Sequence, residues 1–270
     1  MRSLGVVMMV LATAHGGIAA AKPSNPAFLG IGMQDVRQTG PCMITEVTRG
    51  SGAKAAGLRK DDVVLTIDGA AVSNCDAVLR IVQGHQPGDT IAIGVQRVNR
   101  ILNLKADLVS RDEILRRRLV GQPIVATELF NVDDQRSVDL SSLRGKTAIV
   151  GWFDARRCTD CTAVFGRLGD WARAQAGKGG FPPMPLAVTM GQRGEVKQLT
   201  PIGLGVPLAL ADPALYEELT VPDGERINFM VIDCRGVVQY VAPIAPNGDD
   251  TEAAIDELFA AAEQASRRSK

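Results

Sequence analysis

Short apolar runs and helical segments alternate through the second half of the chain, and this alternation constrains the fold more than any other feature. The apolar runs are residues 147–153, 185–190, 206–212, 228–233 and 236–243. Helices are predicted at 159–176, 213–219 and 251–265. Strands that alternate with helices in this way form an α/β layer fold with parallel strands at its centre. The last two apolar runs flank a Cys-Arg-Gly turn and predict a hairpin.

The first half of the chain predicts a different kind of domain. Its apolar runs are 43–47, 63–67 and 90–95, and Gly, Pro, Asn or Asp bounds each of them, as is typical of strands. One short helix is expected from Asn74 to Val82, with Asn74 or Asp76 as its N-cap and Gly84 after its end. These patterns predict a small, mostly β domain at residues 27–108.

A charge-rich segment, LVSRDEILRRRLVGQP at 108–123, separates the two patterns. It predicts a linker at 109–118 that is helical from Arg111 to Arg118. We interpret its three consecutive arginines as a solvated helix face and not as a nucleic-acid contact. The second domain then spans residues 119–268.

The N-terminus has the pattern of a secretory signal peptide. Arg2 precedes an apolar stretch from Leu4 to Ala12 that is too short to span a bilayer, and Ala19–Ala21 forms a small-residue cleavage site. We expect residues 1–21 to be removed and the mature protein to be periplasmic or secreted, where thiols oxidise. A retained membrane anchor is the alternative. No later segment is apolar for long enough to predict stable membrane insertion.

Charge and histidine content argue against two functional classes. The chain has 30 basic and 30 acidic residues, and removal of residues 1–21 with their single arginine leaves 29 − 30 = −1. This balance gives no electrostatic case for nucleic acid or anionic lipid as a partner. Within residues 22–270 the one histidine is His85, in a turn, so a Ser-His-Asp protease site is not expected.

Three stretches of the first domain resemble a PDZ domain of the kind attached to HtrA-type proteases. They are FLGIGM at 28–33, ITEVTRGSGAKAAGLRKDDVVLTIDGAAV at 44–72 and PGDTIAIGVQR at 87–97. The resemblance implies a peptide groove, in which a loop with Gly30 and Gly32 turns backbone N–H groups toward a carboxylate. Leu29 and Ile31 would border the pocket for the terminal side chain, and the next strand would offer an open edge. A groove occluded by its own chain is the alternative.

The second domain resembles the TlpA-like redoxins of the thioredoxin superfamily. The resemblance lies in LVGQPIVATELFNVDDQRSVDLSSLRGKTAIVGWFDARRCTDC at 119–161 and LALADPALYEELTVPDGERINFMVIDCRGVV at 208–238. It implies a central mixed sheet flanked by helices and the activity of a thiol-disulfide oxidoreductase. It also places Cys158 at a strand end and Cys161 in the first turn of the following helix.

That placement has a chemical consequence for the two cysteines. A helix N-terminus carries partial positive charge and free N–H groups, which stabilise the nucleophilic thiolate. Arg156 and Arg157 add positive charge and Asp160 opposes it, so the pKa of Cys158 stays open. Cys161, further into the helix, is expected to be more buried and to resolve a mixed disulfide. An idle vestige of such a site is the alternative.

The other cysteines do not predict a metal site. A structural zinc site takes about four Cys or His ligands, and the second domain has three cysteines and no histidine. We therefore expect no metal and no cofactor. In the first domain Cys42 and Cys75 either pair with each other or remain buried free thiols, and Cys234 is left over.

The chain departs from the redoxin pattern at two places. Thr159-Asp160 replaces the usual Pro or Gly-Pro between the cysteines, and Arg157 replaces the usual tryptophan. Ile227 stands where the family has a cis-proline that helps to hold substrate, so we expect substrate docking around Ile227 to differ.

Together these features favour an exported thiol-disulfide oxidoreductase whose protein or peptide clients are recruited through the PDZ-like groove. A separate redox partner protein would recycle the dithiol. The alternative is a non-enzymatic peptide-binding adaptor with a degenerate thioredoxin-like domain.

Overall fold

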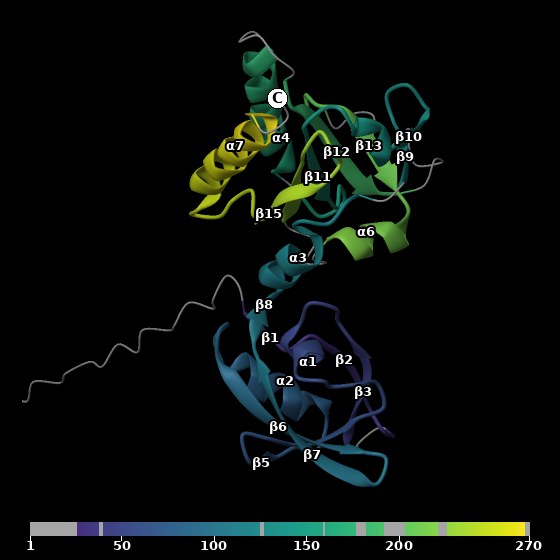
Figure 1. Ribbon diagram of the computed structural model, residues 1–270, viewed down its shortest axis with the longest axis vertical. Coiled ribbons are helices and arrows are strands. Elements are labelled where there is room, and N and C mark those ends of the chain that lie inside the picture. Colours follow the sequence, from purple (N-terminus) through teal and green to yellow (C-terminus); the bar gives the residue numbers. More distant parts are fainter. Residues whose placement is uncertain are drawn as a thin grey trace, which may run out of the picture.

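The computed structural model contains two domains joined through a single short helix (Figure 1). It describes residues 26–37, 40–124, 127–158, 160–176, 182–191, 203–220 and 226–267. The expected signal peptide at 1–21 lies outside these residues. Within the described ranges, no helix is both long enough and apolar enough to cross a bilayer.

The N-terminal domain is built on an antiparallel sheet in the order β2-β3-β4-β6-β7, with β5 beside β4 and a separate β1-β8 pair. Its strands are β1 (Ala27–Phe28), β2 (Ile31–Asp35), β3 (Cys42–Val47), β4 (Val63–Ile67), β5 (Ala70–Ala71), β6 (Thr90–Arg97), β7 (Arg100–Asp107) and β8 (Val109–Ser110). Its helices are α1 (Gly52–Ala55) and α2 (Cys75–Gln83). The three predicted strands are present as β3, β4 and β6, and β2 forms one edge of the sheet.

Helix α2 begins and ends where its sequence predicts. The Asn74 side chain accepts a hydrogen bond from the Ala77 N–H at 2.9 Å, so Asn74 is the N-cap, and Gly84 is the C-cap. Val78 and Val82, four residues apart, are buried on one face of the helix and pack into the domain core.

The C-terminal domain contains a seven-stranded mixed sheet in the order β10-β9-β13-β12-β11-β14-β15. Its strands are β9 (Glu128–Asn131), β10 (Ser137–Asp139), β11 (Ala148–Phe153), β12 (Met184–Met190), β13 (Leu208–Ala211), β14 (Ile227–Ile232) and β15 (Val238–Ile244). The helices are η1 (Leu140–Leu143), α4 (Cys161–Ala176), α6 (Pro213–Leu219) and α7 (Thr251–Arg267). Strands β11, β12 and β13 are parallel, and β14 and β15 form the predicted antiparallel hairpin.

Helices cover both faces of this sheet, which is the layered architecture of the thioredoxin-like fold predicted from the sequence. On one face, α4 and α7 contribute Phe165, Leu168 and Leu258 to a buried cluster. Gly151 on β11 allows close packing there, because an added Cβ would lie 2.6 Å from the rings of Phe165 and Phe229. On the other face a second cluster includes residues of α6 and of the connecting helix.

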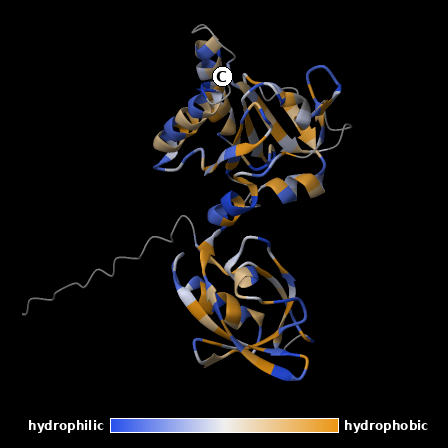
Figure 2. Ribbon diagram, viewed as in Figure 1, coloured by the Kyte–Doolittle hydropathy of each residue, from blue (hydrophilic) through white to orange (hydrophobic). Residues whose placement is uncertain are grey.

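The connecting helix α3 (Arg111–Leu119) differs from the expected solvated linker. Figure 2 shows α3 as largely hydrophilic, yet Ile114 and Leu115 are 4% and 1% exposed. Leu115 packs into the buried cluster between the seven-stranded sheet and α6. Arg116 and Arg117 are exposed, as the predicted solvated face requires, but the prediction did not include the burial of Ile114 and Leu115.

Candidate redox site and peptide groove

The turn that carries Cys158 is held against the ends of two parallel strands. It follows buried strand β11, and the backbone N–H of Cys158 donates to the Asp154 carbonyl at 3.0 Å. The backbone N–H of Ala155 donates to the Thr189 Oγ1 atom on β12 at 3.1 Å. These two contacts fix where the chain leaves the sheet, so the position of Cys158 is set by the sheet itself.

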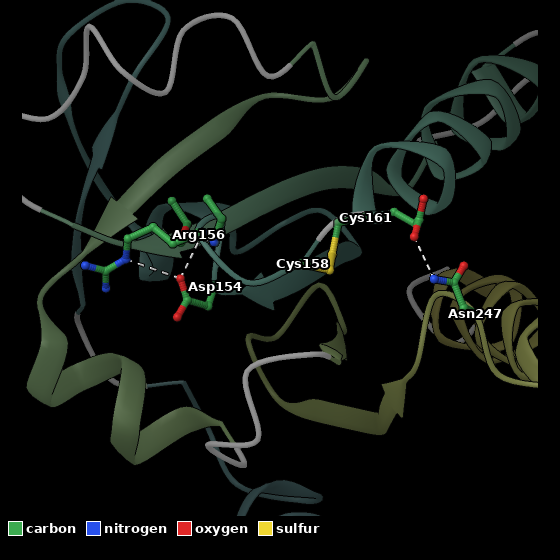
Figure 3. The surroundings of a disulfide bond; sticks show 8 residues. Asp154, Arg156, Cys158, Cys161 and Asn247 are labelled. Atoms are coloured by element: carbon green, nitrogen blue, oxygen red, sulfur yellow. Dashed lines mark hydrogen bonds and ion pairs between the residues drawn. A yellow bond between two sulfur atoms is a disulfide. The ribbon is translucent and has the colours of Figure 1, made fainter.

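Cys158 and Cys161 are joined by a disulfide bond, with their Cα atoms 5.6 Å apart (Figure 3). Cys161 is the first residue of α4 and is 1% exposed, within the cluster formed by α4, α7 and the sheet. Cys158 is half-buried and packs against the edge of that cluster. The pair therefore has an outer and an inner sulfur, as expected from the sequence.

Nearby charges differ from the sequence-based expectation. The Asp154 carboxylate accepts a hydrogen bond from the Arg156 backbone N–H at 3.0 Å and pairs with the Arg156 guanidinium at 3.5 Å. Figure 3 shows the Arg156 side chain directed away from the disulfide. Asp160, next to Cys161, accepts a hydrogen bond from the Asn247 side chain at 2.6 Å. Arg156 is thus largely compensated, and the N-terminus of α4 remains as a source of positive potential.

Ile227 lies at the start of β14 and is fully buried. It belongs to the same buried cluster as Cys161, so its side chain is a core element and is not available to a substrate. The preceding residue, Arg226, pairs with Asp112 of α3 through both carboxylate oxygens, at 2.8 and 2.9 Å. Sequence reasoning missed this pair and the Asn247–Asp160 contact, because each joins residues far apart in the chain.

Cys234 follows the other end of β14, so the strand separates it from Ile227 by ~20 Å. It is a half-buried free thiol. Neighbouring Asp233 is 4% exposed at its side chain. Burial alone would raise the pKa of Asp233, but hydrogen bonds from the Val237 N–H and from Arg235 outweigh that effect and lower it. Cys234 thus occupies a rigid turn remote from the dithiol.

The predicted carboxylate loop lies between β1 and β2. Gly30 has φ of +84°, and an added Cβ would lie 2.1 Å from the Ser51 Cβ, so only glycine fits there. Leu29 is 3% exposed and packs in the domain core, whereas Ile31 is half-buried. Gly32 is a strand residue paired with Glu46. Leu29 therefore supports the loop from beneath, and Ile31 is the more accessible of the two apolar residues.

A disulfide anchors the helix that accompanies the edge strand. Cys75, the first residue of α2, is bonded to Cys42 on β3, with Cα atoms 4.7 Å apart. Its backbone N–H also donates to the Asp35 carboxylate at the end of β2, at 2.7 Å. These contacts decide between the alternatives that the sequence left open for Cys42 and Cys75. Ligand atoms of Asp35, Cys42 and Cys75 lie within 4.8 Å of one another, but the disulfide removes both thiolates.

A family model for the PDZ domain matches residues 27–108. Residues 27–108 form a PDZ domain. The matched residues coincide with the predicted first domain, and the second domain has the predicted mixed sheet flanked by helices. No curated protein matches the chain.

Solved structures resemble the two parts of the chain separately. The PDZ part is similar to the HtrA-type protease AlgW with decapeptide, with 27% identity over 32% of this chain and 30% of that protein and a TM-score of 0.31. This chain thus spans less than a third of that protease. A putative protein disulfide isomerase from Bacteroides thetaiotaomicron has 18% identity, coverage of 53% and 90%, and a TM-score of 0.41. The thioredoxin domain of a thiol-disulfide oxidoreductase from Bacteroides vulgatus has 17% identity, coverage of 52% and 96%, and a TM-score of 0.39.

The PDZ domain and the connecting helix α3 meet without an intervening loop. Ser110 pairs with Ala27 in the β1-β8 ladder, and its hydroxyl also accepts the Glu113 N–H at 3.0 Å as the N-cap of α3. The Arg111 guanidinium lies 4.9 Å from the centre of the Phe28 ring, a cation–π contact. The PDZ domain is therefore attached directly to the connecting helix α3.

Proposed function

We propose that this protein is an exported thiol-disulfide oxidoreductase that recruits its clients through the PDZ groove. One observation carries the proposal: a disulfide joins a half-buried Cys158 to a buried Cys161 at the first residue of α4. This asymmetry allows a client sulfur to reach one cysteine while the other is reserved for resolution.

In the reduced protein, the Cys158 thiolate attacks a client disulfide and releases the first client thiolate. The Cys161 thiol then loses its proton and attacks the Cys158 sulfur in the mixed disulfide, releasing the second client thiolate. Two electrons pass from the dithiol to the client, and the Cys158–Cys161 disulfide forms. The positive end of the α4 dipole favours the thiolate form of Cys158. A dithiol partner protein would restore the reduced state.

The PDZ groove is proposed to hold an extended client segment beside β2, the edge strand of its sheet. The client's terminal carboxylate would meet the loop around Gly30, whose carbonyl already accepts the Thr48 N–H at 2.9 Å. Since Ser110 belongs to both the β1-β8 pair and the α3 cap, no residue lies between the last PDZ strand and the start of α3. A short, stiff tether raises the effective concentration of a bound client when its length matches the span.

Export is part of the same proposal. The N-terminal pattern predicts a signal peptide, and the Cys42–Cys75 disulfide is the kind of bond that persists in an oxidising compartment. Fractionation of cells that express the full-length chain, with mass analysis of the mature N-terminus, tests this part. Recovery of the intact N-terminus in the cytoplasm would contradict it.

The catalytic role is tested with three single variants in a disulfide-reduction assay on insulin. Cys158→Ser is expected to abolish turnover, because it removes the attacking sulfur. Cys161→Ser is expected to accumulate a mixed disulfide with the client. Cys234→Ser, which alters the remote free thiol, is the matched control and keeps wild-type turnover. Wild-type turnover by Cys158→Ser would contradict the assignment.

Client recruitment is tested separately, with one disulfide-containing peptide that ends in an apolar residue. The peptide is compared as the free acid and as the C-terminal amide. The amide lacks the terminal carboxylate but has the same side chains. The free acid is expected to show the lower KM at unchanged kcat. Equal KM values for the two forms would separate the redox activity from the groove and remove the recruitment step.

A non-enzymatic adaptor is the second candidate, and the surroundings of the dithiol favour it. The Asp160 carboxylate lies beside Cys161, Arg156 is paired with Asp154, and Ile227 offers no exposed surface. Equilibration of the full chain in glutathione buffers, followed by alkylation and mass measurement, distinguishes the two candidates. Reversible modification of Cys158 and Cys161 supports the enzyme, and a pair that stays unreactive at every buffer ratio supports the adaptor.

A further inference from the structure

A cavity of about 400 Å³ lies where the PDZ domain, α3 and the thioredoxin-like domain meet. Its size falls within the range of about 300–1,000 Å³ that is usual for small-molecule sites, which occur preferentially at domain interfaces. The PDZ domain contributes Arg49 and Gly50, and the rest of the lining comes from α3, the segment after it, α6 and Val238 of β15. The cavity is separate from both the dithiol and the peptide groove described above.

Most of the cavity wall is apolar. The apolar lining residues are Leu119, Pro123, Ile124, Leu215, Leu219 and Val238. They lie on α3 and the segment after it, on α6 and on strand β15, and Ile124 and Val238 belong to the buried cluster on that face of the sheet. This wall can remove the hydrocarbon part of a ligand from water, at about 25 cal/mol for each Å² buried.

The charged groups at the cavity do not balance. Arg117 is paired with Glu113 at 2.8 Å, but the same carboxylate also contacts Arg116 at 3.4 Å. The Arg118 guanidinium donates to the main-chain carbonyl of Glu218, and Arg49 forms no ion pair with any residue that the structure describes. Three guanidinium groups, those of Arg49, Arg117 and Arg118, face the single Glu218 carboxylate in the lining, so the cavity carries a net positive charge.

The environment of Arg118 reflects this imbalance. Burial lowers the pKa of Arg118, the nearby Arg49 lowers it further, and Glu218 only partly offsets both effects. Two like charges are therefore held close together beside an apolar wall, where an anion would relieve their repulsion.

We propose that this cavity binds an amphipathic monoanion, a carboxylate with an aliphatic tail. The head group pairs with Arg49 and Arg118, and the tail lies along the apolar wall. A single negative charge pairs with the two guanidinium groups, whereas the second charge of a dianion would be repelled by Glu218. Because Arg49 comes from the PDZ domain and the wall from its neighbour, the bound ligand holds the two domains together.

Titration calorimetry of the full chain tests this with three probes: decanoate, decanol and acetate. Decanoate carries both head and tail, decanol only the tail, and acetate only the head. We expect saturable one-to-one binding of decanoate and no saturable binding of the other two. Binding of decanol or acetate as tight as that of decanoate, or no binding of decanoate, would overturn the proposal.

Two variants complete the test. Arg49→Gln is expected to weaken decanoate binding about tenfold, the effect of removing one charge-assisted hydrogen bond at a partly exposed site. Arg100→Gln, an exposed arginine on β7 outside the cavity lining, is the matched control and leaves the affinity unchanged. Equal affinities of Arg49→Gln and wild type would refute the head-group assignment. Because the readout is binding and not turnover, its outcome is independent of the proposed redox function.

Discussion

The Asp112–Arg226 pair connects α3 to the residue just before β14, and its removal should destabilise the second domain. Both carboxylate oxygens of Asp112 accept hydrogen bonds from the Arg226 guanidinium, at 2.8 and 2.9 Å. The two side chains are only 9% and 16% exposed. Asp112 also lies in the first turn of α3, where a negative charge is favourable. We therefore choose Asp112→Asn, which keeps the shape of the side chain and removes its charge.

The expected cost follows from the exposure of the two partners. Breaking a fully buried ion pair costs about 3–5 kcal/mol, because the remaining charge is left without compensation. Exposed pairs contribute about 0.2–1 kcal/mol. The small exposed fractions of this pair place Asp112→Asn near the buried limit, and we expect a loss of about 2–4 kcal/mol in the free energy of unfolding. The double variant with Arg226→Gln should recover part of this loss, because neither charge then remains.

Urea unfolding followed by tryptophan fluorescence measures this loss in the thioredoxin-like domain. Both tryptophans of the chain, Trp152 and Trp171, lie in the thioredoxin-like domain. Glu113→Gln is the matched control on the same helix, because it breaks the exposed pair with Arg117 and should cost at most about 1 kcal/mol. If Asp112→Asn destabilises the domain no more than Glu113→Gln does, the reasoning from burial is refuted.

Three further predictions concern the PDZ domain. Serine at both Cys42 and Cys75 opens a bridge between residues 33 positions apart and should cost ~3.7 kcal/mol by loop entropy, measured by thermal unfolding against the oxidised wild type. Gly30→Ala should cost at least ~1–2 kcal/mol in the same assay, because the left-handed backbone disfavours a side chain. For Asp62, burial alone would raise the pKa, but hydrogen bonds from Arg97 and a backbone N–H lower it overall. The ionised Asp62 therefore stabilises the fold fully above its unfolded pKa of about 3.9, and this stabilisation is lost as the pH falls through its lower pKa in the folded protein. Asp62→Asn should flatten the dependence of unfolding free energy on pH between about pH 5 and 2. An unchanged acid limb in that variant would contradict the last prediction.

Capping residues and apolar runs were sufficient to predict most of the helices and strands that the sequence analysis named. Helix α6 has the predicted bounds, and Asp212 and Pro213 at its start are typical N-cap and first-turn residues. The continuous apolar run of β11 was recognisable because both faces of this central strand are buried. In the PDZ domain β7 was not predicted, since Ile101 on it is 71% exposed and obscures any burial pattern.

The residues that decide the candidate site were less predictable. The spacing of Cys158 and Cys161 identified the dithiol, and family resemblance identified the loop around Gly30. Nothing local showed that Leu29 would be a core residue or that Ile227 would be buried beside Cys161. Those outcomes depend on which strands become neighbours in the sheet. The distance between two residues along the sequence does not predict which strands pair.

By itself the sequence determined two domains, their fold classes, and a cysteine pair at the start of a helix. These features follow from periodicity, capping residues and spacing, which act over a few positions of the chain. Only the tertiary structure joined Cys42 to Cys75, Asp112 to Arg226 and Arg118 to the Glu218 carbonyl. Such contacts form when distant segments pack on a common core, so burial and geometry select the partners and local composition does not.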